Sequence, residues 1–377
     1  MRIAIIGTRG IPNHYGGFEQ FAEYLAKGLV KRGFEIIVYN SHNHPYQEKE
    51  LNGVKIVHCY DPEVKIGTAG QFIYDLNCIV DVRKRKCDII LQLGYTSSSI
   101  WGRFLPKNCI ITTNMDGLEW KRTKYSPSVK RFLRYAETLA IKYSHHLISD
   151  SVGIQDYLMD TYNVTSTYIA YGATLFKKPD INVLKQYGLI PFEYDMVIAR
   201  LEPENSIEII LDGVVTAKLK RPFIVIGKHK TTYGKYLKSK FSKYPMIQFI
   251  GGIYDIELLN NLRYYTNLYF HGHTVGGTNP SLLEAMASRS LICANKNTFN
   301  ESILGADAIY FNDDNDVAMH LLNVNCRRDH YQLMIKNNSD KVVNIYDWKI
   351  IIDKYADHFN AIVGISPSVP IPVDEAI

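Results

Sequence analysis

The sequence predicts two consecutive α/β domains, each a doubly wound parallel sheet with helices on both faces. Short runs rich in Ile and Val alternate with longer amphipathic runs along the chain, which is the pattern of strand–helix–strand crossovers. A stretch containing Pro and Gly near residue 180 separates two such series, and the length of 377 residues exceeds what one hydrophobic core usually organises. We expect a first domain of residues 1–175, completed by a C-terminal helix within 346–377, and a second domain of residues 176–345.

The first domain opens with the strand RIAIIG at 2–7 and a helix over 18–33, on which Phe21, Leu25 and Leu29 form one apolar stripe. The elements expected next are strands at 35–40, 54–59, 88–94 and 109–117, a helix at 70–86, and a helix that runs into a strand over 128–148. The helical period places Val129, Phe132, Leu133, Ala136, Leu139, Ala140 and Tyr143 on the inner face of that last helix.

The second domain opens with MVIARLEPEN at 196–205, a strand followed by a loop. Helices are expected at 206–218, 232–241 and 256–266, and strands at 222–228, 247–252 and 268–272. The final helix buries Trp348, Ile352, Tyr355 and Phe359, and the Pro-rich tail GISPSVPIPVDEAI is expected to be extended along the surface. Two such domains in tandem predict a ligand cleft between the carboxyl ends of their sheets.

Composition excludes several classes of protein. A hydrophobic content of 46% with 21% charged residues is that of a globular chain. No apolar run reaches the roughly eighteen residues of a membrane-spanning helix, and the six cysteines have no metal-ligand spacing, which favours a reduced, cytoplasmic setting. Basic clusters at 82–86, 120–124 and 130–134 indicate either solvated helix faces or an anionic partner, such as a phospholipid surface or a pyrophosphate-bearing acceptor. No repeated aromatic platform accompanies them, so nucleic acid is not the expected partner.

The most informative motif is HGHTVGGTNPSLLEAMA at 271–287. Asn279 followed by Pro280 is a helix start signal, and the two glycines just upstream let backbone N–H groups approach a ligand. Free amides together with the helix dipole favour a phosphate or a carboxylate there. Glu284, one turn into the helix, is placed to accept hydrogen bonds from hydroxyl groups of the same ligand, although an ordinary capped helix with an exposed Glu284 fits the glycines as well. His271 and His273 are expected at the rim of the cleft.

Three loops that follow strands supply further candidates. GTRGIPNHYGGFEQF at 7–21 has the wrong glycine spacing for a dinucleotide fingerprint, but it could close over a diphosphate or be a surface loop. Arg200 offers a planar fork to phosphate oxygens, or a surface ion pair to Glu202 or Glu204. NMDGLEWKR at 114–122 combines carboxylates, cations and a tryptophan, which suits a hydroxyl-rich ligand, although a tryptophan after a strand is often part of the core.

These motifs together resemble the retaining, family 4-like glycosyltransferases of the GT-B fold, whose two Rossmann-like domains face each other across a cleft and whose C-terminal helix crosses back to the N-domain. GTRGIPNHYGGFE, DGLEWKR, ARLEPEN and HGHTVGGTNPSLLEAMA look like the bacterial rhamnosyltransferase-type subgroup of polysaccharide biosynthesis. The resemblance covers nearly the whole chain. It implies transfer of a sugar from a dTDP- or UDP-sugar, with retention and without a cofactor or metal, to a saccharide acceptor that is linked to a polyprenyl diphosphate at the inner membrane face.

The resemblance also implies residue roles. The catalytic residues would be Asp116, Arg200 and Glu284. The donor would be bound by Gly16, Gly17, Arg200, Gly251, Ile253, His273, Gly277, Thr278, Asn279 and Glu284, and the acceptor by Glu119, Trp120, Lys121 and Arg122. Glu284 would bind the ribose, and the segment from Gly251 to Tyr254 would read the base through its backbone. The departing phosphate would act as the base, which accounts for a sequence without an obvious nucleophile.

Two positions depart from the family pattern. The first signature glutamate is Gly276 here, and the usual diphosphate lysine is Asn205. Loss of a phosphate cation weakens stabilisation of the leaving group unless another base such as Arg9 replaces it. The departures leave open a non-catalytic nucleotide-sugar-binding protein, and a nucleotide-sugar epimerase of the same fold is a further alternative. A Rossmann oxidoreductase is disfavoured by the glycine spacing.

Overall fold

The computed structural model describes residues 1–253 and 255–364. It divides into two units by contacts, the first made of 1–121, 125–171 and the C-terminal segment from 348, and the second of 122–124 and 172–347. The Pro-rich tail expected at the C-terminus lies outside the described residues from position 365.

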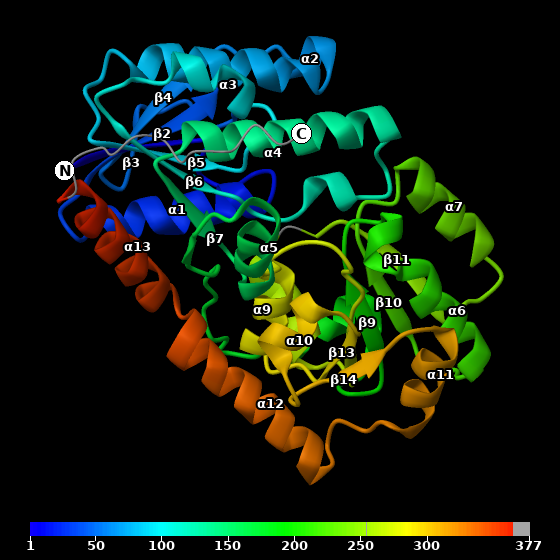
Figure 1. Cartoon of the computed structure of the whole chain (residues 1–377). Coiled ribbons are helices and arrows are strands. Elements are labelled where there is room, and N and C mark those ends of the chain that lie inside the picture. Colours follow the sequence, from blue (N-terminus) through cyan, green and yellow to red (C-terminus); the bar gives the residue numbers. More distant parts are fainter. Residues whose placement is uncertain (254, 365–377) are drawn as a thin grey trace. The chain divides into compact units, whose positions relative to one another are not determined.

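The first unit is a mainly parallel sheet with the strand order β3-β4-β2-β1-β5-β6-β7-β8 (Figure 1). Its strands are β1 Arg2–Ile6, β2 Glu35–Ser41, β3 Glu50–Leu51, β4 Val54–Cys59, β5 Ile89–Leu93, β6 Ile110–Asn114, β7 His146–Ser149 and β8 Thr167–Tyr168. Its helices are α1 Gly17–Val30, α2 Glu63–Ile66, α3 Ala69–Val82, η1 Ser99–Phe104, η2 Glu119–Lys121, α4 Pro127–Tyr143, α5 Val152–Tyr162 and α13 Trp348–Val363. The β3–β4 pair is antiparallel, because Asn52 and Gly53 both have positive φ, as in a tight hairpin turn.

The C-terminal helix α13 packs on α1 within the first unit (Figure 1). Gly28 of α1 lies so close to Ile352 that an added Cβ would approach the isoleucine side chain to 2.3 Å, so a larger residue would force Ile352 to shift. Phe21 of α1 meets Tyr355 at 5.4 Å between ring centroids. The predicted core positions Trp348, Ile352, Tyr355 and Phe359 are all buried, which confirms the periodicity of this helix.

Helix α4 differs from the expectation at its first turn. Val129, expected to face inward, is 38% exposed. The buried residues of α4 begin at Leu133, so the predicted inner face is covered only from the second turn onward. The buried face also contains Glu137, which accepts hydrogen bonds from the hydroxyls of Tyr95, Tyr157 and Tyr162 at 2.9, 2.7 and 2.6 Å. An apolar pattern cannot reveal such a buried carboxylate.

The second unit is a parallel sheet with the strand order β11-β10-β9-β12-β13-β14. Its strands are β9 Asp195–Ile198, β10 Phe223–Ile226, β11 Ile247–Gly251, β12 Leu268–His271, β13 Ile292–Asn295 and β14 Ile309–Phe311. Its helices are η3 Ile181–Tyr187, η4 Pro203–Asn205, α6 Ile207–Ala217, α7 Thr232–Lys240, α8 Ile256–Tyr264, α9 Pro280–Ala287, α10 Thr298–Leu304, α11 Asp314–Asn323, α12 Asp329–Lys341 and η5 Val342–Tyr346. A continuous apolar cluster that includes Phe223, Phe270 and Phe311 forms its core.

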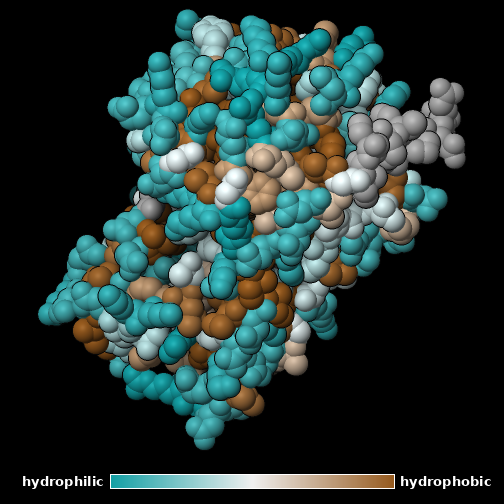
Figure 2. Space-filling view, turned by 90° about the vertical axis from the view of Figure 1, so that its left-hand side faces the viewer, coloured by the Kyte–Doolittle hydropathy of each residue, from teal (hydrophilic) through white to brown (hydrophobic). Residues whose placement is uncertain are grey.

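The face in Figure 2 is mostly hydrophilic, with hydrophobic residues in separate groups. Within 1–253 and 255–364, no helix combines the length and the apolar character that a crossing of the membrane requires.

Candidate functional site

The strand order of the second unit places two predicted loops next to each other. β9 and β12 are neighbours at the point where the order of the sheet reverses, and ligands of open α/β sheets bind at the carboxyl ends of strands at such a point. The loop after β9 contains Arg200, and the loop after β12 runs from Gly272 to Asn279. Arg200 is exposed, so its guanidinium is accessible to an anion.

The two loops are tied together through backbone contacts. An added Cβ on Gly272 would lie 2.0 Å from the carbonyl oxygen of Asn205, so this close packing requires glycine. The backbone oxygen of Glu204 accepts hydrogen bonds from the N–H and the hydroxyl of Thr274 at 3.0 and 2.9 Å. The side-chain amide of Asn205 donates to the carbonyl of Arg200 at 2.6 Å. Asn205, at the position where the resemblance in sequence leads us to expect a lysine, therefore holds the arginine loop in place.

A third loop fixes the backbone at His273. The carbonyl of His273 accepts from the side-chain amides of Asn297 and Asn300 at 2.9 and 3.1 Å, and Asn297 also caps helix α10. Sequence reasoning missed these two residues. The motif NTFN at 297–300 is nevertheless a helix start signal after a strand, and could have indicated them.

Helix α9 begins as its sequence predicts. The side chain of Asn279 accepts from the N–H of Ser281 at 2.9 Å, and Pro280 occupies the first helical position. Gly277 is partly exposed and Thr278 is buried. Gly276 has φ +132° with nothing within 4 Å of an added Cβ, a conformation that a glutamate rarely adopts. The loop backbone therefore disfavours a glutamate, the residue that the resemblance in sequence leads us to expect at this position.

Glu284 is held by a residue that the sequence did not indicate. Its carboxylate lies 2.6 Å from Nη2 of Arg263 in α8, and the side chains are 18% and 1% exposed. Arg263 also donates to the side-chain oxygen of Asn260 at 3.0 Å. Glu284 is therefore a fixed, mostly buried carboxylate with one exposed edge. In the sequence, the only indication of Arg263 as its partner is the position of this arginine near the end of an otherwise amphipathic helix.

The two histidines after β12 are stacked, with ring centroids 4.6 Å apart. His271 is 1% exposed, so its expected position at a rim is wrong: it is the last residue of a central strand, covered by the loop that follows. Burial lowers the pKa of His271 to about 3, and burial also lowers the pKa of His273 well below the ordinary range of histidine. Both rings are neutral near pH 7, so neither supplies positive charge to a phosphate.

The remaining strands of this sheet complete its carboxyl edge. Gly251 ends β11 with φ +87°, its carbonyl accepts from the N–H of Gly227 at 2.9 Å, and Ile253 follows partly buried. Tyr254, the last residue of the predicted base-reading segment, lies outside the described residues. His229, in the loop after β10, lies near Gly251, whose added Cβ would be 3.8 Å from its ring. Sequence reasoning missed this loop, which the sequence GKHK after an apolar strand could have indicated.

In the first unit, the loop after β1 is built around a buried glutamate. Glu19 is 3% exposed and accepts from the N–H of Arg9 at 2.9 Å and from the hydroxyl of Thr8 at 3.2 Å. Gly16 caps α1 and Gly17 is its first residue, so the predicted glycine pair does open a helix. Arg9 contacts both carboxylate oxygens of Glu63, at 2.9 and 2.8 Å. The carboxylate of Glu63 therefore neutralises the positive charge of Arg9, the residue that we expected to take the place of the missing lysine at the diphosphate.

The predicted acceptor residues divide between the units. Asp116, with φ +50°, accepts from the hydroxyl of Tyr171 at 3.3 Å, and its N–H donates to the side-chain oxygen of Asn114 at 3.0 Å. Glu119, Trp120 and Lys121 form the turn η2 in the first unit. Arg122 belongs to the second unit, where its guanidinium lies 3.6 Å from the carboxylate of Glu204.

The ring of Trp120 is already in contact with other side chains. The guanidinium of Arg134 lies over it at 4.5 Å from the centroid, and the ammonium of Lys121 is at 5.5 Å. Such cation–π contacts fix the ring. Arg134 is exposed on the basic side of α4, as expected, and its guanidinium in addition lies over the tryptophan ring.

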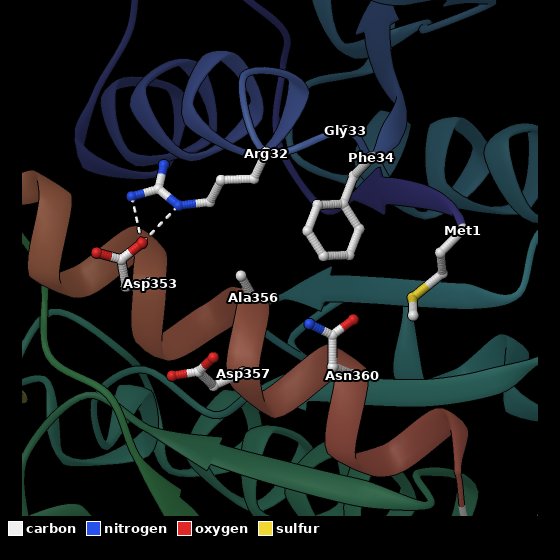
Figure 3. Close-up of a pocket in the computed structure, with 8 residues that line it drawn as sticks. All are labelled: Met1, Arg32, Gly33, Phe34, Asp353, Ala356, Asp357 and Asn360. Atoms are coloured by element: carbon white, nitrogen blue, oxygen red, sulfur yellow. Dashed lines mark hydrogen bonds and ion pairs between the residues drawn. The ribbon is translucent and has the colours of Figure 1, made fainter.

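A separate hollow of about 400 Å³ lies in the first unit, at the amino ends of strands β1 and β2 (Figure 3). It is lined by residues that precede β1 and β2, such as Met1 and Phe34, and by α13. Arg32 donates to Asp353 at 2.6 Å beside it. No predicted site residue lines this hollow, and it stands at the amino ends of the strands, where α/β sheets rarely bind ligands.

Comparisons with known proteins address the fold. A family model described as a domain of unknown function (DUF1972) matches residues 1–174. No curated protein matches the sequence.

Solved structures match over the whole chain. Sucrose-phosphate synthase from Thermosynechococcus elongatus has a TM-score of 0.80 at 15% identity, covering 97% of this chain and 100% of its own. HepE from Anabaena in complex with UDP-glucose has a TM-score of 0.74 at 15% identity, with 96% and 99% covered. An α,α-trehalose-phosphate synthase from Burkholderia xenovorans in complex with glucose-6-phosphate has a TM-score of 0.72 at 10% identity, with 96% and 100% covered. The chain therefore has the GT-B fold, as its sequence predicts.

Proposed function

We propose that this protein is a glycosyltransferase that moves a sugar from a nucleotide-diphosphate sugar to a saccharide acceptor. One observation carries the proposal: the loops of Arg200 and of Gly276–Asn279 are adjacent at the switch point of the second sheet, and a held carboxylate, Glu284, follows one turn into α9. This set offers the guanidinium of Arg200 and the positive, amino-terminal end of helix α9 to a diphosphate. It offers a carboxylate to a ribose one helical turn away.

The solved structures support a nucleotide-sugar donor. HepE was solved with UDP and with UDP-glucose, and a trehalose-phosphate synthase with glucose-6-phosphate. We assign Gly251 and Ile253 to the base, Glu284 to the ribose, and Arg200, Gly277, Thr278 and Asn279 to the diphosphate and donor sugar. Gly16 and Gly17 also serve the diphosphate, and His273 positions the loop through its backbone. The donor is a dTDP- or UDP-sugar, and the resemblance in sequence favours rhamnose.

The reaction that we propose proceeds with retention. The bond between the sugar C1 and the phosphate oxygen breaks, and the acceptor hydroxyl forms the new C1–O bond on the same face while its proton passes to the departing phosphate. Arg200 and the amides before α9 stabilise the charge that develops on that phosphate. Asp116, fixed by Tyr171, orients the transferred sugar or the acceptor, and Glu119, Trp120, Lys121 and Arg122 serve the acceptor. Because Arg134 covers Trp120, that tryptophan acts by shaping the loop.

We further propose that the acceptor is linked to a polyprenyl diphosphate and that the protein works at the inner, anionic face of the membrane as part of polysaccharide synthesis. Arg131 is exposed on α4 and Lys130 is partly exposed. Clusters of such charges attract anionic headgroups, by about 1 kcal/mol for each residue near the surface.

A nucleotide panel tests the proposal. UDP or dTDP should raise the melting temperature, and Glu284→Ala should remove most of that shift. A melting temperature that stays unchanged across UDP, dTDP, GDP and ADP overturns the proposal.

Incubation with a nucleotide-sugar panel and analysis of the products then separates the alternatives. A transferase releases the nucleoside diphosphate and attaches the sugar to an acceptor. An epimerase returns an isomerised sugar, and a binding protein gives the thermal shift without any turnover.

A further inference from the structure

The second unit contains a cavity of about 620 Å³ beside the loop of Arg200. The residues that line it include Thr123, Lys124, Glu202, Thr231, Tyr233 and Tyr236, all of which belong to this unit. Its volume lies within the range of about 300–1,000 Å³ that is usual for small-molecule sites. None of the roles assigned above to the donor involves these six residues.

Two tyrosines of α7 form an aromatic platform in this cavity. Their ring centroids are 5.9 Å apart and their planes differ by 29°. Tyr233 packs against the core of the unit on one side, whereas Tyr236 is 47% exposed. The exposed ring of Tyr236 and the neighbouring ring of Tyr233 give the cavity wall a flat apolar surface. An exposed position of a surface helix does not need such a ring in order to fold.

The platform is held in place by one carboxylate. The hydroxyl of Tyr236 donates to Glu208 at 2.5 Å and that of Tyr233 donates to the other oxygen of Glu208 at 3.4 Å. Lys240 bridges Glu208 and Asp212 at 2.7 and 2.8 Å. Because the hydroxyls are engaged, the ring orientations are fixed before any ligand arrives, which lowers the entropy cost of binding.

The other walls of the cavity supply polar groups. The hydroxyl of Thr123 donates to the carboxylate of Glu204 at 3.0 Å, which fixes the 122–124 segment there. Glu202 adds a carboxylate and Thr231, the cap of α7, a hydroxyl. Flat aromatic faces next to carboxylate and hydroxyl groups suit a sugar, whose C–H face packs on a ring while its hydroxyls bond to the polar wall. Lys124 and Glu202 bring one cation and one carboxylate to these walls, so the cavity has no excess of positive charge to favour a phosphorylated ligand.

We propose that this cavity is a saccharide subsite, which binds a sugar unit of an oligosaccharide acceptor away from the hydroxyl that receives the new sugar. This inference rests on the proposed function. Glu202, at the wall of the subsite, lies in the same loop as Arg200, the assigned phosphate ligand. The N–H of Glu202 donates to the carbonyl of Arg200 at 2.8 Å. The acceptor is therefore an oligosaccharide, and a monosaccharide acceptor binds more weakly because it cannot fill the subsite.

The test measures binding of the full chain to an array of bacterial surface oligosaccharides, followed by saturation-transfer NMR with the oligosaccharides that bind. Tyr236→Ala should weaken binding about tenfold through loss of the ring contact. Tyr236→Phe, which keeps the ring, should bind within about twofold of the parent protein. Tyr135→Ala serves as the control, because Tyr135 is 58% exposed but lies in the first unit.

The thermal shift with UDP or dTDP is recorded for every variant and should be the same for Tyr236→Ala as for the parent protein. Equal oligosaccharide binding by Tyr236→Ala and the parent protein overturns the subsite, and so does an array on which only phosphorylated ligands depend on Tyr236. If the nucleotide shift persists in either case, the proposed donor site still stands. Absence of any nucleotide shift counts against the proposed function itself, whatever the array shows.

Discussion

Nη2 of Arg263 lies 2.6 Å from Oε2 of Glu284, and this arginine side chain is only 1% exposed. The pair joins the end of α8 to the second turn of α9. A buried guanidinium is stable only when it is paired and hydrogen-bonded. Asn260 and Glu284 supply these partners, so the requirements of folding fix the orientation of the carboxylate that we assign to the ribose.

Replacement of Arg263 should therefore destabilise the protein and weaken nucleotide binding together. We expect Arg263→Met to lower the free energy of unfolding by about 3 kcal/mol, because it removes one partner of a largely buried ion pair. Glu284→Gln keeps a hydrogen-bond acceptor for Arg263, so it should cost less stability but still reduce the thermal shift with UDP or dTDP. Urea unfolding and nucleotide titration measure the two effects. A full nucleotide shift in Glu284→Gln would contradict the role in ribose binding.

Glu19 should govern the loop after β1. Glu19→Ala leaves the N–H of Arg9 and the hydroxyl of Thr8 without their acceptor, which costs about 1–3 kcal/mol for a buried donor. If the loop serves the diphosphate, the affinity for UDP or dTDP should fall as well. Glu48→Ala, at an exposed position of the same unit, is the control and should change neither quantity. Unaltered stability of Glu19→Ala in urea would show that the loop does not depend on this carboxylate.

Asn205→Lys introduces the residue that the resemblance in sequence leads us to expect at this position, but it should not improve binding of a diphosphate. Asn205 is 2% exposed and its amide holds the carbonyl of Arg200. A buried ammonium without a carboxylate partner is costly, and the arginine loop loses its fixed position. We expect a lower melting temperature and weaker nucleotide binding than in the parent protein. Tighter nucleotide binding by this variant would contradict our account of the departure from the family pattern.

The pH dependence of stability should include a contribution from His271. Burial lowers the pKa of His271 to about 3, whereas in the unfolded chain it is about 6.5. Between these values the unfolded chain binds a proton that the folded protein does not, so stability falls as the pH falls from about 6.5 towards 3. His271→Phe removes this contribution, and its unfolding free energy should decrease less between pH 7 and pH 5, by about 2 kcal/mol.

The stability of His271→Phe has to be compared with that of the parent protein at each pH, because another buried group, the carboxyl of Asp75, changes stability in the opposite direction. Burial raises the pKa of Asp75 to about 7, so this carboxyl favours folding as the pH falls through the same range. His330→Ala, at an exposed position, is the control for replacing a histidine outside the core. Parallel curves for His271→Phe and the parent protein would contradict the buried neutral state of His271.

Membrane association should depend on the basic side of α4. Lys130→Glu with Arg131→Glu should reduce binding to vesicles that contain anionic phospholipid at low salt, and added salt should reduce binding of the parent protein in the same way. Arg134 is left unchanged because it holds Trp120. Lys49→Glu with Lys107→Glu, at two exposed positions of the same unit, is the charge-matched control. Equal binding by both double variants would show that the effect comes from net charge alone.

Several features of this protein follow from local sequence. The alternation of apolar runs determines a strand such as Phe223–Ile226 or a helix such as Gly17–Val30, because the period of the side chains selects one or the other. The Asn-Pro step before α9 determines where that helix begins, because a cap and a proline act within one turn. The same local reasoning fails for Val129, because exposure depends on what packs against a helix.

Other features depend on contacts between segments far apart in the chain. Arg263 pairs with Glu284, and Glu137 accepts hydrogen bonds from three tyrosine hydroxyls, only because folding brings distant elements together. His271 is buried and neutral for the same reason. The cavity beside Tyr236 likewise forms only because the 122–124 segment and α7 both lie next to the loop of Arg200. The sequence by itself predicted the fold class and many of the strands and helices, because these follow from local side-chain patterns. The tertiary structure decided which side chains are held, charged or exposed, because burial and pairing depend on neighbours that no local pattern specifies.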